Sequence, residues 1–168
     1  TETFNSQRSP TTYSTLLKTE NTLKKNLVTK DHYFAYLFLL VNKANYLDNS
    51  NNQTKAIQVY EEALQLYNTQ KLNTIFKYDI TEYCLKPLGI LYNKIGDYTN
   101  AENTIKHYIF LAEKKKNNKH RISGAINLAQ LYYTIGNYKA AIKIAKAGLQ
   151  LHSVLDTQKL KLKRIITN

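Results

Sequence analysis

The sequence predicts an all-α protein made of repeated helix pairs, and two observations lead to this prediction. The first is an internal repeat, in which residues 88–105 (LGILYNKIGDYTNAENTI) align without a gap with residues 128–145 (LAQLYYTIGNYKAAIKIA). The second is the scarcity of helix breakers, with 5 Gly and 2 Pro among 168 residues. Few breakers between long periodic runs favour helices over a β fold with many turns. Apolar residues make up 43% of the chain, which is enough for a continuous core.

The two copies share a set of positions at an offset of 40 residues. The matched pairs are Leu88 with Leu128, Gly89 with Ala129, Tyr92 with Tyr132, Gly96 with Gly136, Tyr98 with Tyr138, and Ala101 with Ala141. The small residues let two helices cross closely, and we expect the tyrosines to fill the core between them. Gly96 and Gly136 come where the first helix must stop in a left-handed conformation. The Asp or Asn that follows each glycine can then cap the second helix.

This pattern of Leu-Gly, Tyr, Gly, aromatic and Ala resembles the tetratricopeptide repeat. A third, degenerate copy lies 45 residues before the second, with Asn51 at the position of the left-handed glycine. The residues that fit it are Ala44, Leu47, Asn51, Ala56, Tyr60 and Ala63. The resemblance implies about three antiparallel helix pairs plus flanking helices, stacked into a right-handed superhelix.

The expected elements follow in order. Residues 1–10, with Ser, Asn and Pro, predict a flexible lead-in, and residues 11–168 a single helical repeat domain. The repeats are expected at about 31–68, 72–116 and 119–152. Helices are expected at about 12–28, 32–48, 53–68, 72–95, 98–116, 119–135, 138–152 and 157–166. The first and last helices lie outside the repeats and would cover the ends of the stack, because a repeat cannot bury its apolar face alone.

Three residues carry local predictions. Asp31 and Asp156 each precede an apolar run and are expected to be helix N-caps. Pro87 falls inside the helix expected at 72–95, where it removes a backbone donor and clashes with the carbonyl of Tyr83. We expect a kink there.

No pattern in the sequence indicates catalysis, a metal site or a cofactor. The four histidines, His32, His107, His120 and His152, lack metal-ligand spacing and are expected to be exposed or half-buried on helices. The single cysteine, Cys84, has no partner for a disulfide within the chain and is expected to be a small core residue. Glu61 and Glu62 fit a solvated helix face, and no glycine-rich phosphate loop is present.

The net charge of +12 favours polyanionic partners, but the lysines that carry this charge are spread along the chain. The one dense run, from Lys114 to Arg121, is expected at a helix end and the following connection, where cations suit the helix dipole. We therefore expect no specific nucleic-acid ligand. The longest apolar run, residues 33–41, is too short to span a membrane, and a cytoplasmic location is expected. The absence of methionine indicates a piece of a longer protein.

The resemblance also implies a binding site. Members of this family usually bind peptides in a concave groove lined by the first helix of each pair. Five positions of each first helix are carried over by register. They are Phe38, Val41, Asn45, Asp48 and Asn49 in the first copy, Tyr83, Lys86, Ile90, Asn93 and Lys94 in the second, and Ser123, Ile126, Gln130, Tyr133 and Thr134 in the third. Of these, the residues expected to bind the peptide are Asn45, Tyr83, Lys86, Asn93, Lys94, Gln130 and Tyr133. Lys86 matches one lysine of the family's clamp for a chain-terminal carboxylate, but Ile90 stands where that clamp has Asn, so this ligand is not expected. Alternatively, this surface does not bind a peptide but packs on another domain of the same chain.

The sequence thus predicts a non-enzymatic module that binds a protein or peptide segment. Two alternatives stay open. The stretch EYCLKPLGILYNKIGDYTNAENTI is similar to repeat regions ahead of caspase-like CHAT domains in bacteria. Such a likeness implies a regulatory or substrate-recruiting segment of a larger CHAT-type protease. A peptide-sensing regulator is the other alternative, although no helix-turn-helix for DNA is visible.

Overall fold

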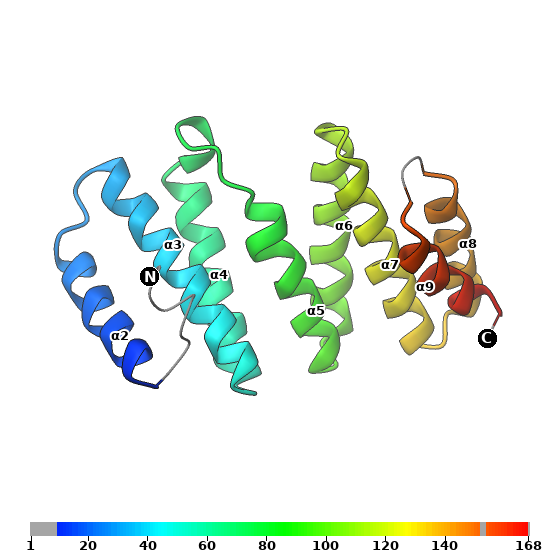
Figure 1. Cartoon of the computed structure of the whole chain (residues 1–168), viewed down its shortest axis with the longest axis horizontal. Coiled ribbons are helices and arrows are strands. Elements are labelled where there is room, and N and C mark those ends of the chain that lie inside the picture. The colour runs from blue at the N-terminus through cyan, green and yellow to red at the C-terminus, as the bar shows by residue number, and fades with distance from the viewer. Residues whose placement is uncertain (1–9, 152–153, 168) are drawn as a thin grey trace. The chain divides into compact units, whose positions relative to one another are not determined.

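The computed structural model describes residues 10–151 and 154–167, and these form α-helices joined by short connections and, between α4 and α5, by a longer one (Figure 1). The helices are α2 (Pro10–Lys25), α3 (Lys30–Asn49), α4 (Gln53–Thr69), α5 (Lys86–Lys94), α6 (Tyr98–Lys114), α7 (Asn118–Thr134), α8 (Tyr138–Leu149) and α9 (Asp156–Thr167). Two compact units divide the chain at Cys84, which we call unit 1 (Thr1–Cys84) and unit 2 (Leu85–Asn168). The all-α prediction is confirmed, and the expected lead-in lies almost entirely outside the described residues.

Unit 1 is built around the pair α3 and α4, with α2 packed against α3 (Figure 1). The pair buries Ala44, Ala56 and Ala63 completely, so the small residues of the degenerate copy lie at close helix contacts as predicted. Leu16 brings the apolar stripe of α2 into this core. The ring of Tyr13 stacks on that of Tyr46 with centroids 4.2 Å apart, which adds a second contact between α2 and α3.

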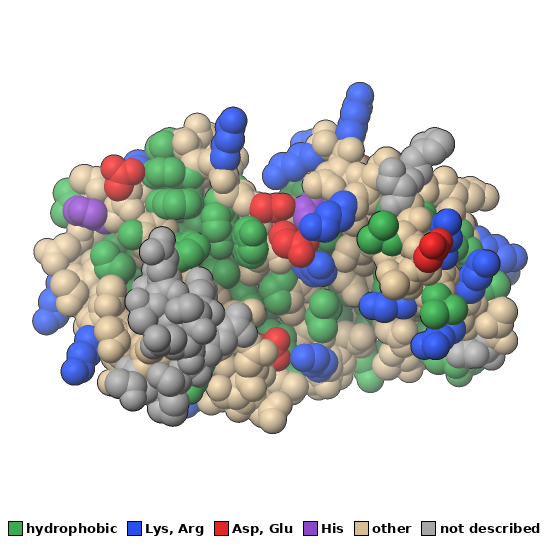
Figure 2. All heavy atoms as spheres, in the orientation of Figure 1, with side chains coloured by type: hydrophobic (Ala, Val, Ile, Leu, Met, Phe, Trp, Pro, Cys, Tyr) green, Lys and Arg blue, Asp and Glu red, His purple; other side chains and the backbone are tan. Residues whose placement is uncertain are grey.

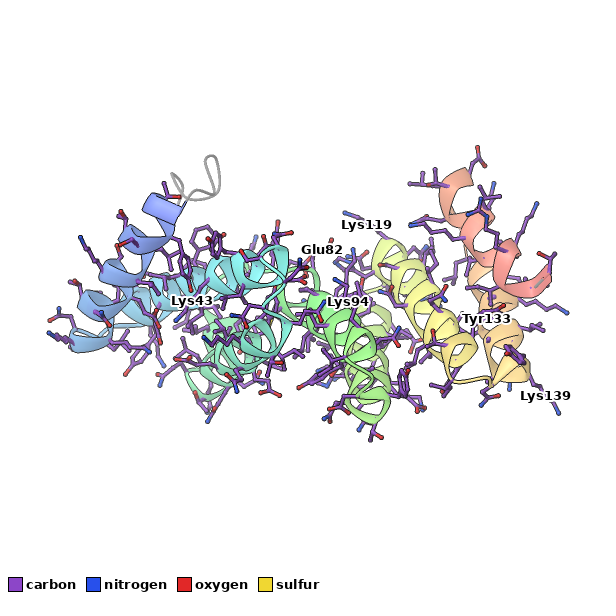
Figure 3. All side chains as sticks on the ribbon, turned by 90° about the horizontal axis from the view of Figure 1, so that it is seen from below. Lys43, Glu82, Lys94, Lys119, Tyr133 and Lys139 are labelled. Carbon is purple, nitrogen blue, oxygen red and sulfur yellow. The ribbon has the colours of Figure 1, made fainter. Side chains whose placement is uncertain are left out.

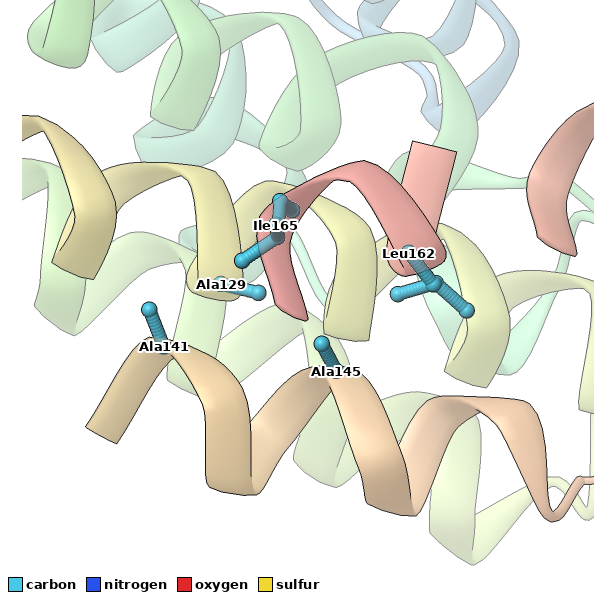
Figure 4. Close-up of a cluster of buried hydrophobic side chains, with 5 residues drawn as sticks. All are labelled: Ala129, Ala141, Ala145, Leu162 and Ile165. Atoms are coloured by element: carbon cyan, nitrogen blue, oxygen red, sulfur yellow. The ribbon is translucent and has the colours of Figure 1, made fainter. Parts of the chain in front are cut away.

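Unit 2 contains the pairs α5–α6 and α7–α8, followed by α9. Ala101 and Ala141 are fully buried, as the repeat pattern predicted. The close-up in Figure 4 shows Leu162 and Ile165 of α9 directed at the alanines of α7 and α8. Helix α9 therefore covers the apolar end of the last pair, which confirms the role expected for a terminal helix.

The turns within the pairs follow one local rule. Gly96 and Gly136 have φ values of 80° and 77°, and Asn51 has a φ of 57°, all in the left-handed region. The side chains of Asp97 and Asn137 then accept a hydrogen bond from the backbone N–H three residues later, 3.2 Å away in both cases. These local interactions end one helix and begin the next.

The first helix of the second repeat is much shorter than expected. The prediction placed it at 72–95, but the structure has a 3₁₀ turn at Leu72–Thr74, a non-helical stretch, a π-helical turn at Thr81–Leu85, and then α5. The non-helical stretch is held by aromatic packing, since the ring of Phe76 stacks on Phe34 of α3 at a centroid distance of 4.2 Å. This long-range contact outweighs the helical propensity of the segment.

Pro87 lies in the first turn of α5, directly after the π-helical turn. The backbone before α5 is already helical, because Leu85 has right-handed helical dihedral angles and the π-helical turn leads into α5 without a break. The π-helical turn is therefore where the helix accommodates the backbone donor that Pro87 lacks. The sequence predicted a kink in the middle of a long helix. The irregularity at this position is instead a π-turn that ends where the α-helix begins.

Two further local predictions need correction. Helix α3 is capped by Thr29 and not by Asp31: the Thr29 hydroxyl accepts from the His32 N–H at 3.3 Å, and the His32 side chain completes a capping box. Asp31 lies in the first turn, where its charge still suits the helix dipole. Asp156 is the first residue of α9 and not the residue before it.

Tyr98 and Tyr138, expected in the core, are 40% and 57% exposed. Both are the first residues of their helices, where the side chain projects beyond the helix pair. Tyr60 and Tyr92, which lie in the middle of their helices, are buried as predicted.

Candidate functional site

A pocket of about 410 Å³ lies between α7 and α9 in unit 2. Helix α7 contributes Ile126, Asn127, Gln130 and Tyr133, and helix α9 contributes Lys161, Arg164 and Ile165. Three of these, Ile126, Gln130 and Tyr133, are groove residues that the repeat register predicted. The structure therefore brings part of the expected groove together with residues of the terminal helix.

Helix periodicity explains which side chains reach the pocket. Residues three and four apart share a helix face, so Ile126, Gln130 and Tyr133 form one stripe along α7. Figure 3 shows Tyr133 near one end of α7 and Lys119 near the other. On α9, Lys161 and Arg164 are likewise three residues apart. Ile165 is 6% exposed and joins the pocket to the alanine-rich core beneath it.

The pocket has a cationic rim. Lys161 and Arg164 are exposed, and neither forms an ion pair within the described part of the chain. No acidic residue is among the described residues that line the pocket. Gln130 is exposed, and Tyr133 is half-buried with its ring edge-on to Tyr138 at 5.3 Å. The arrangement offers two positive charges, two side-chain amides and an apolar floor.

The other predicted groove residues of unit 2 lie on α5 and do not line this pocket. Lys86 is half-buried and Lys94 is exposed. The Oδ1 atom of Asn93 is buried without a hydrogen-bond partner. The Asn93 side-chain oxygen is thus an exception to the rule that buried amide oxygens have a hydrogen-bond partner.

The predicted groove residues Asn45 and Tyr83 belong to unit 1. Asn45 is half-buried, and its side-chain oxygen accepts a hydrogen bond of 3.0 Å from the Asn49 side chain. Tyr83 is 54% exposed, and its ring centroid lies 5.5 Å from that of Tyr78. Neither residue is among those that line the α7–α9 pocket.

A larger space of about 540 Å³ lies in unit 1 among α2, α3 and α4. Its lining includes Lys43, but this ammonium is held 2.7 Å from the Glu20 carboxylate. The charge of Lys43 is thus already neutralised within unit 1.

A family model described as "Tetratricopeptide repeat" matches residues 39–70 and 123–151. These stretches correspond to α3–α4 and α7–α8. These two stretches are tetratricopeptide repeats. The pair α5–α6 lies outside the two matched stretches, yet it has the same left-handed glycine and Asp cap between its helices. A search of curated proteins and a search of solved structures each gave no match.

Tetratricopeptide repeats generally mediate protein–protein interaction, and the fold is generally non-catalytic. Within the described residues, no group of three His, Cys, Asp or Glu side chains is placed to hold a metal ion. No helix among those residues is both long and apolar enough to cross a membrane. Cys84 is fully buried, and burial raises the pKa of its thiol to about 12, which makes the thiol a poor nucleophile at neutral pH.

One histidine prediction was wrong. His120 is 4% exposed, and its Nδ1 atom lies 3.2 Å from the Tyr108 hydroxyl. It lies in the first turn of α7, where the side chain of Asn117 accepts from its backbone N–H and directs it toward α6. The hydrogen bond between the two side chains makes His120 part of the α6–α7 core.

Sequence reasoning missed Lys161, Arg164 and Asn127. The repeat register assigns groove positions only to the first helices of the copies, so α9 was interpreted as a cover for the core. A signal was present, however: Lys161 and Arg164 alternate with the buried Leu162 and Ile165. Helix α9 packs on both α7 and α8, and its side chains therefore border the α7–α9 pocket.

Proposed function

We propose that this tetratricopeptide-repeat chain is a protein-interaction module that binds a partner segment along the first-helix side of unit 2. The observation that carries the proposal is the α7–α9 pocket, which contains Gln130 and Tyr133. Both were selected by repeat register alone. Their place in an open, lined pocket supports a role in contact rather than in packing.

The chemistry of these residues suits a peptide. The Gln130 amide can donate to a peptide carbonyl and accept from a peptide N–H at once. The half-buried Tyr133 offers a rigid apolar ring with a polar hydroxyl, a combination enriched at binding hot spots. The stripe from Ile126 to Tyr133 spans about 10 Å of helix at 1.5 Å per residue. That length accommodates about three residues of an extended segment.

The test is selection from a displayed random-peptide library on the full chain, followed by affinity measurement with variants. We expect Tyr133→Ala to weaken the binding free energy of the selected peptides by about 1–3 kcal/mol, and Gln130→Ala to weaken it less. Tyr98→Ala is the matched control, because Tyr98 is an exposed tyrosine that does not line the pocket. Thermal melting by circular dichroism checks that each variant remains folded.

If no selected peptide responds to either pocket substitution while both variants remain folded, the proposal is wrong for unit 2. Tyr83→Ala provides a separate arm for unit 1, because this exposed tyrosine was predicted in the groove. Binding lost only in Tyr83→Ala would move the partner surface to unit 1.

The remaining sequence predictions stay predictions. These are the groove roles of Asn45, Lys86, Asn93 and Lys94, a right-handed superhelix, a bacterial source and a cytoplasmic location. A recruiting segment of a larger CHAT-type enzyme and a peptide-sensing regulator likewise stay alternatives without a supporting observation.

A further inference from the structure

The positive charge of the chain is concentrated in unit 2. Residues 85–168 contain 15 Lys and Arg against 4 Asp and Glu, a net charge of +11. Residues 1–84 contain 9 against 8, a net charge of +1. The sequence-based view of a charge spread along the chain is therefore corrected: the cations are spread, but most of the acids lie in unit 1. In Figure 2, blue Lys and Arg side chains gather over the region of α9.

Within this basic unit, the α7–α9 pocket places two cations above an apolar floor. Lys161 and Arg164 lie three residues apart on α9, a spacing that puts their Cβ atoms about 5–6 Å apart on one helix face. Ile126 and Ile165 supply the apolar surface, and Asn127 and Gln130 supply amides. Two adjacent cations with no acidic neighbour in the described lining leave an uncompensated positive potential that a ligand can neutralise.

We propose that this pocket binds an acidic segment of a partner protein, with Asp or Glu side chains on Lys161 and Arg164 and a neighbouring apolar side chain on Ile126 and Ile165. The proposal rests on the proposed function and names the chemistry of its partner. Arg164 can hold a carboxylate through two parallel N–H···O bonds, and Lys161 adds a second charge-assisted bond. The amides of α7 are left to bind the peptide backbone.

Two features favour acidic side chains over other anions. Lys161 and Arg164 follow one another along one face of α9, a spacing that can offer one cation to each of two carboxylates of an extended segment. The floor is apolar and Tyr133 is half-buried, so an occupant that brings apolar surface gains more than a phosphate backbone does. A nucleic acid would instead use the lysines of unit 2 without regard to this pocket.

The experiment uses the full chain and labelled peptides followed by fluorescence anisotropy. The main probe is a short peptide in which Glu alternates with Leu and Ser, with an amidated end. Its counterparts carry Gln in place of Glu, or a free terminal carboxylate with Gln throughout, and oligo-uridine serves as the nucleic-acid probe. The variants are Lys161→Gln, Arg164→Gln and the double substitution.

The matched control is Lys163→Gln, which removes an exposed cation of the same helix that does not line the pocket. We expect the double pocket variant to lower the affinity for the Glu peptide at least about tenfold, and Lys163→Gln to lower it less than about twofold. The Gln peptides should bind weakly to every form of the protein. Thermal melting ensures that the comparison is made between folded proteins.

Several results would overturn the proposal. Equal losses in Lys163→Gln and the pocket variants would show diffuse attraction to unit 2. Equal binding of the Glu and Gln peptides would show that carboxylates are not recognised. Tighter binding of the peptide whose only carboxylate is terminal, or of oligo-uridine with the same dependence on Lys161 and Arg164, would assign the pocket to another ligand.

The two proposals fail in different ways. If library peptides depend on Tyr133 but not on Lys161 or Arg164, the interaction module stands and the acidic partner is wrong. If binding depends on none of the three residues, both proposals fail.

Discussion

At the scale of single residues, close helix crossings depend on residues with a very small side chain or none. A Cβ atom added to Gly89 of α5 would lie 2.8 Å from Cγ1 of Ile105 in α6. That atom is near the backbone of a buried isoleucine and has little freedom to move. The crossing of α5 and α6 therefore requires glycine for space, and not for an unusual backbone angle.

Gly89→Ala is expected to lower the free energy of unfolding by about 1–3 kcal/mol through overpacking, reduced by up to about 1 kcal/mol from the better helix propensity of alanine. Urea denaturation of the full chain measures the loss. In an Ile105→Ala background the space is open, so the same substitution should be neutral or stabilising. An equal loss in both backgrounds would rule out the Gly89–Ile105 contact as the cause.

Cys84 provides a second prediction at this scale. Its Sγ atom lies 3.3 Å from the Tyr60 carbonyl oxygen, the side chain is fully buried, and burial raises the pKa of the thiol to about 12. The folded protein should therefore react with a thiol reagent at pH 8 only at the rate at which it opens, and quickly in denaturant. Rapid stoichiometric labelling of the folded chain would contradict this environment.

At the scale of elements, α2 is attached to α3 by a mostly buried ion pair as well as by apolar packing. The Glu20 carboxylate is 2.7 Å from the Lys43 ammonium and 3.1 Å from that of Lys24. Burial alone raises the pKa of Glu20, but the hydrogen bonds from Lys43 and Lys24 outweigh it and place the pKa below the ordinary value of 4.5. The charged form of Glu20 is thus stabilised by the attachment of α2.

This depressed pKa sets the direction of a pH effect. The contribution of Glu20 to stability is complete above its unfolded pKa, near 4.5, and is lost as the pH falls through the lower pKa of the folded state. We expect the amide hydrogens of α2 to lose protection from exchange below pH 4.5 before those of α3 and α4. Hydrogen exchange followed by mass spectrometry at a series of pH values below and above 4.5 measures this loss of protection.

Glu20→Gln tests the same attachment at neutral pH, where it should cost about 1–3 kcal/mol because Lys43 is left largely buried without its partner. The matched control is Glu113→Gln on α6, an exposed carboxylate. The idea fails if Glu20→Gln has the same stability as the wild-type chain, or keeps its full acid sensitivity in α2.

At the scale of the whole molecule, the distribution of charge between the two units decides where polyanions are attracted, more than the total net charge does. Unit 2 has a net charge of +11 and unit 1 of +1, so polyanions are attracted mainly to unit 2. The dense run at Lys114–Arg121 lies at the end of α6 and the start of α7, as the sequence predicted. Its lysines are exposed, whereas His120 within it is buried.

We expect binding to nucleic acid to be of the non-specific kind. Affinity for a random-sequence duplex should fall at least about tenfold between low and physiological salt, without preference among sequences. Fluorescence titration at several salt concentrations measures this. A sequence-selective complex that persists at high salt would contradict the view that the charge of unit 2 serves an acidic protein partner.

The sequence by itself determined the helix pairs, their left-handed turns and their caps. Gly96 with Asp97, and Gly136 with Asn137, act through atoms a few residues apart, so they are readable without a fold. The alanines at the crossings were readable for a related reason, because the same spacing recurs in both copies. The same register selected Ile126, Gln130 and Tyr133, which line the α7–α9 pocket.

Only the tertiary structure decided the features that depend on contacts distant in sequence. The stack of Phe76 on Phe34 holds residues 75–79 out of a helix, although nothing in their own sequence forbids one. Glu20 meets Lys43 because α2 packs on α3. Lys161 and Arg164 meet Gln130 and Tyr133 because α9 covers the alanines of α7 and α8. Such contacts arise from the burial of apolar surface between whole helices, which local propensity does not encode.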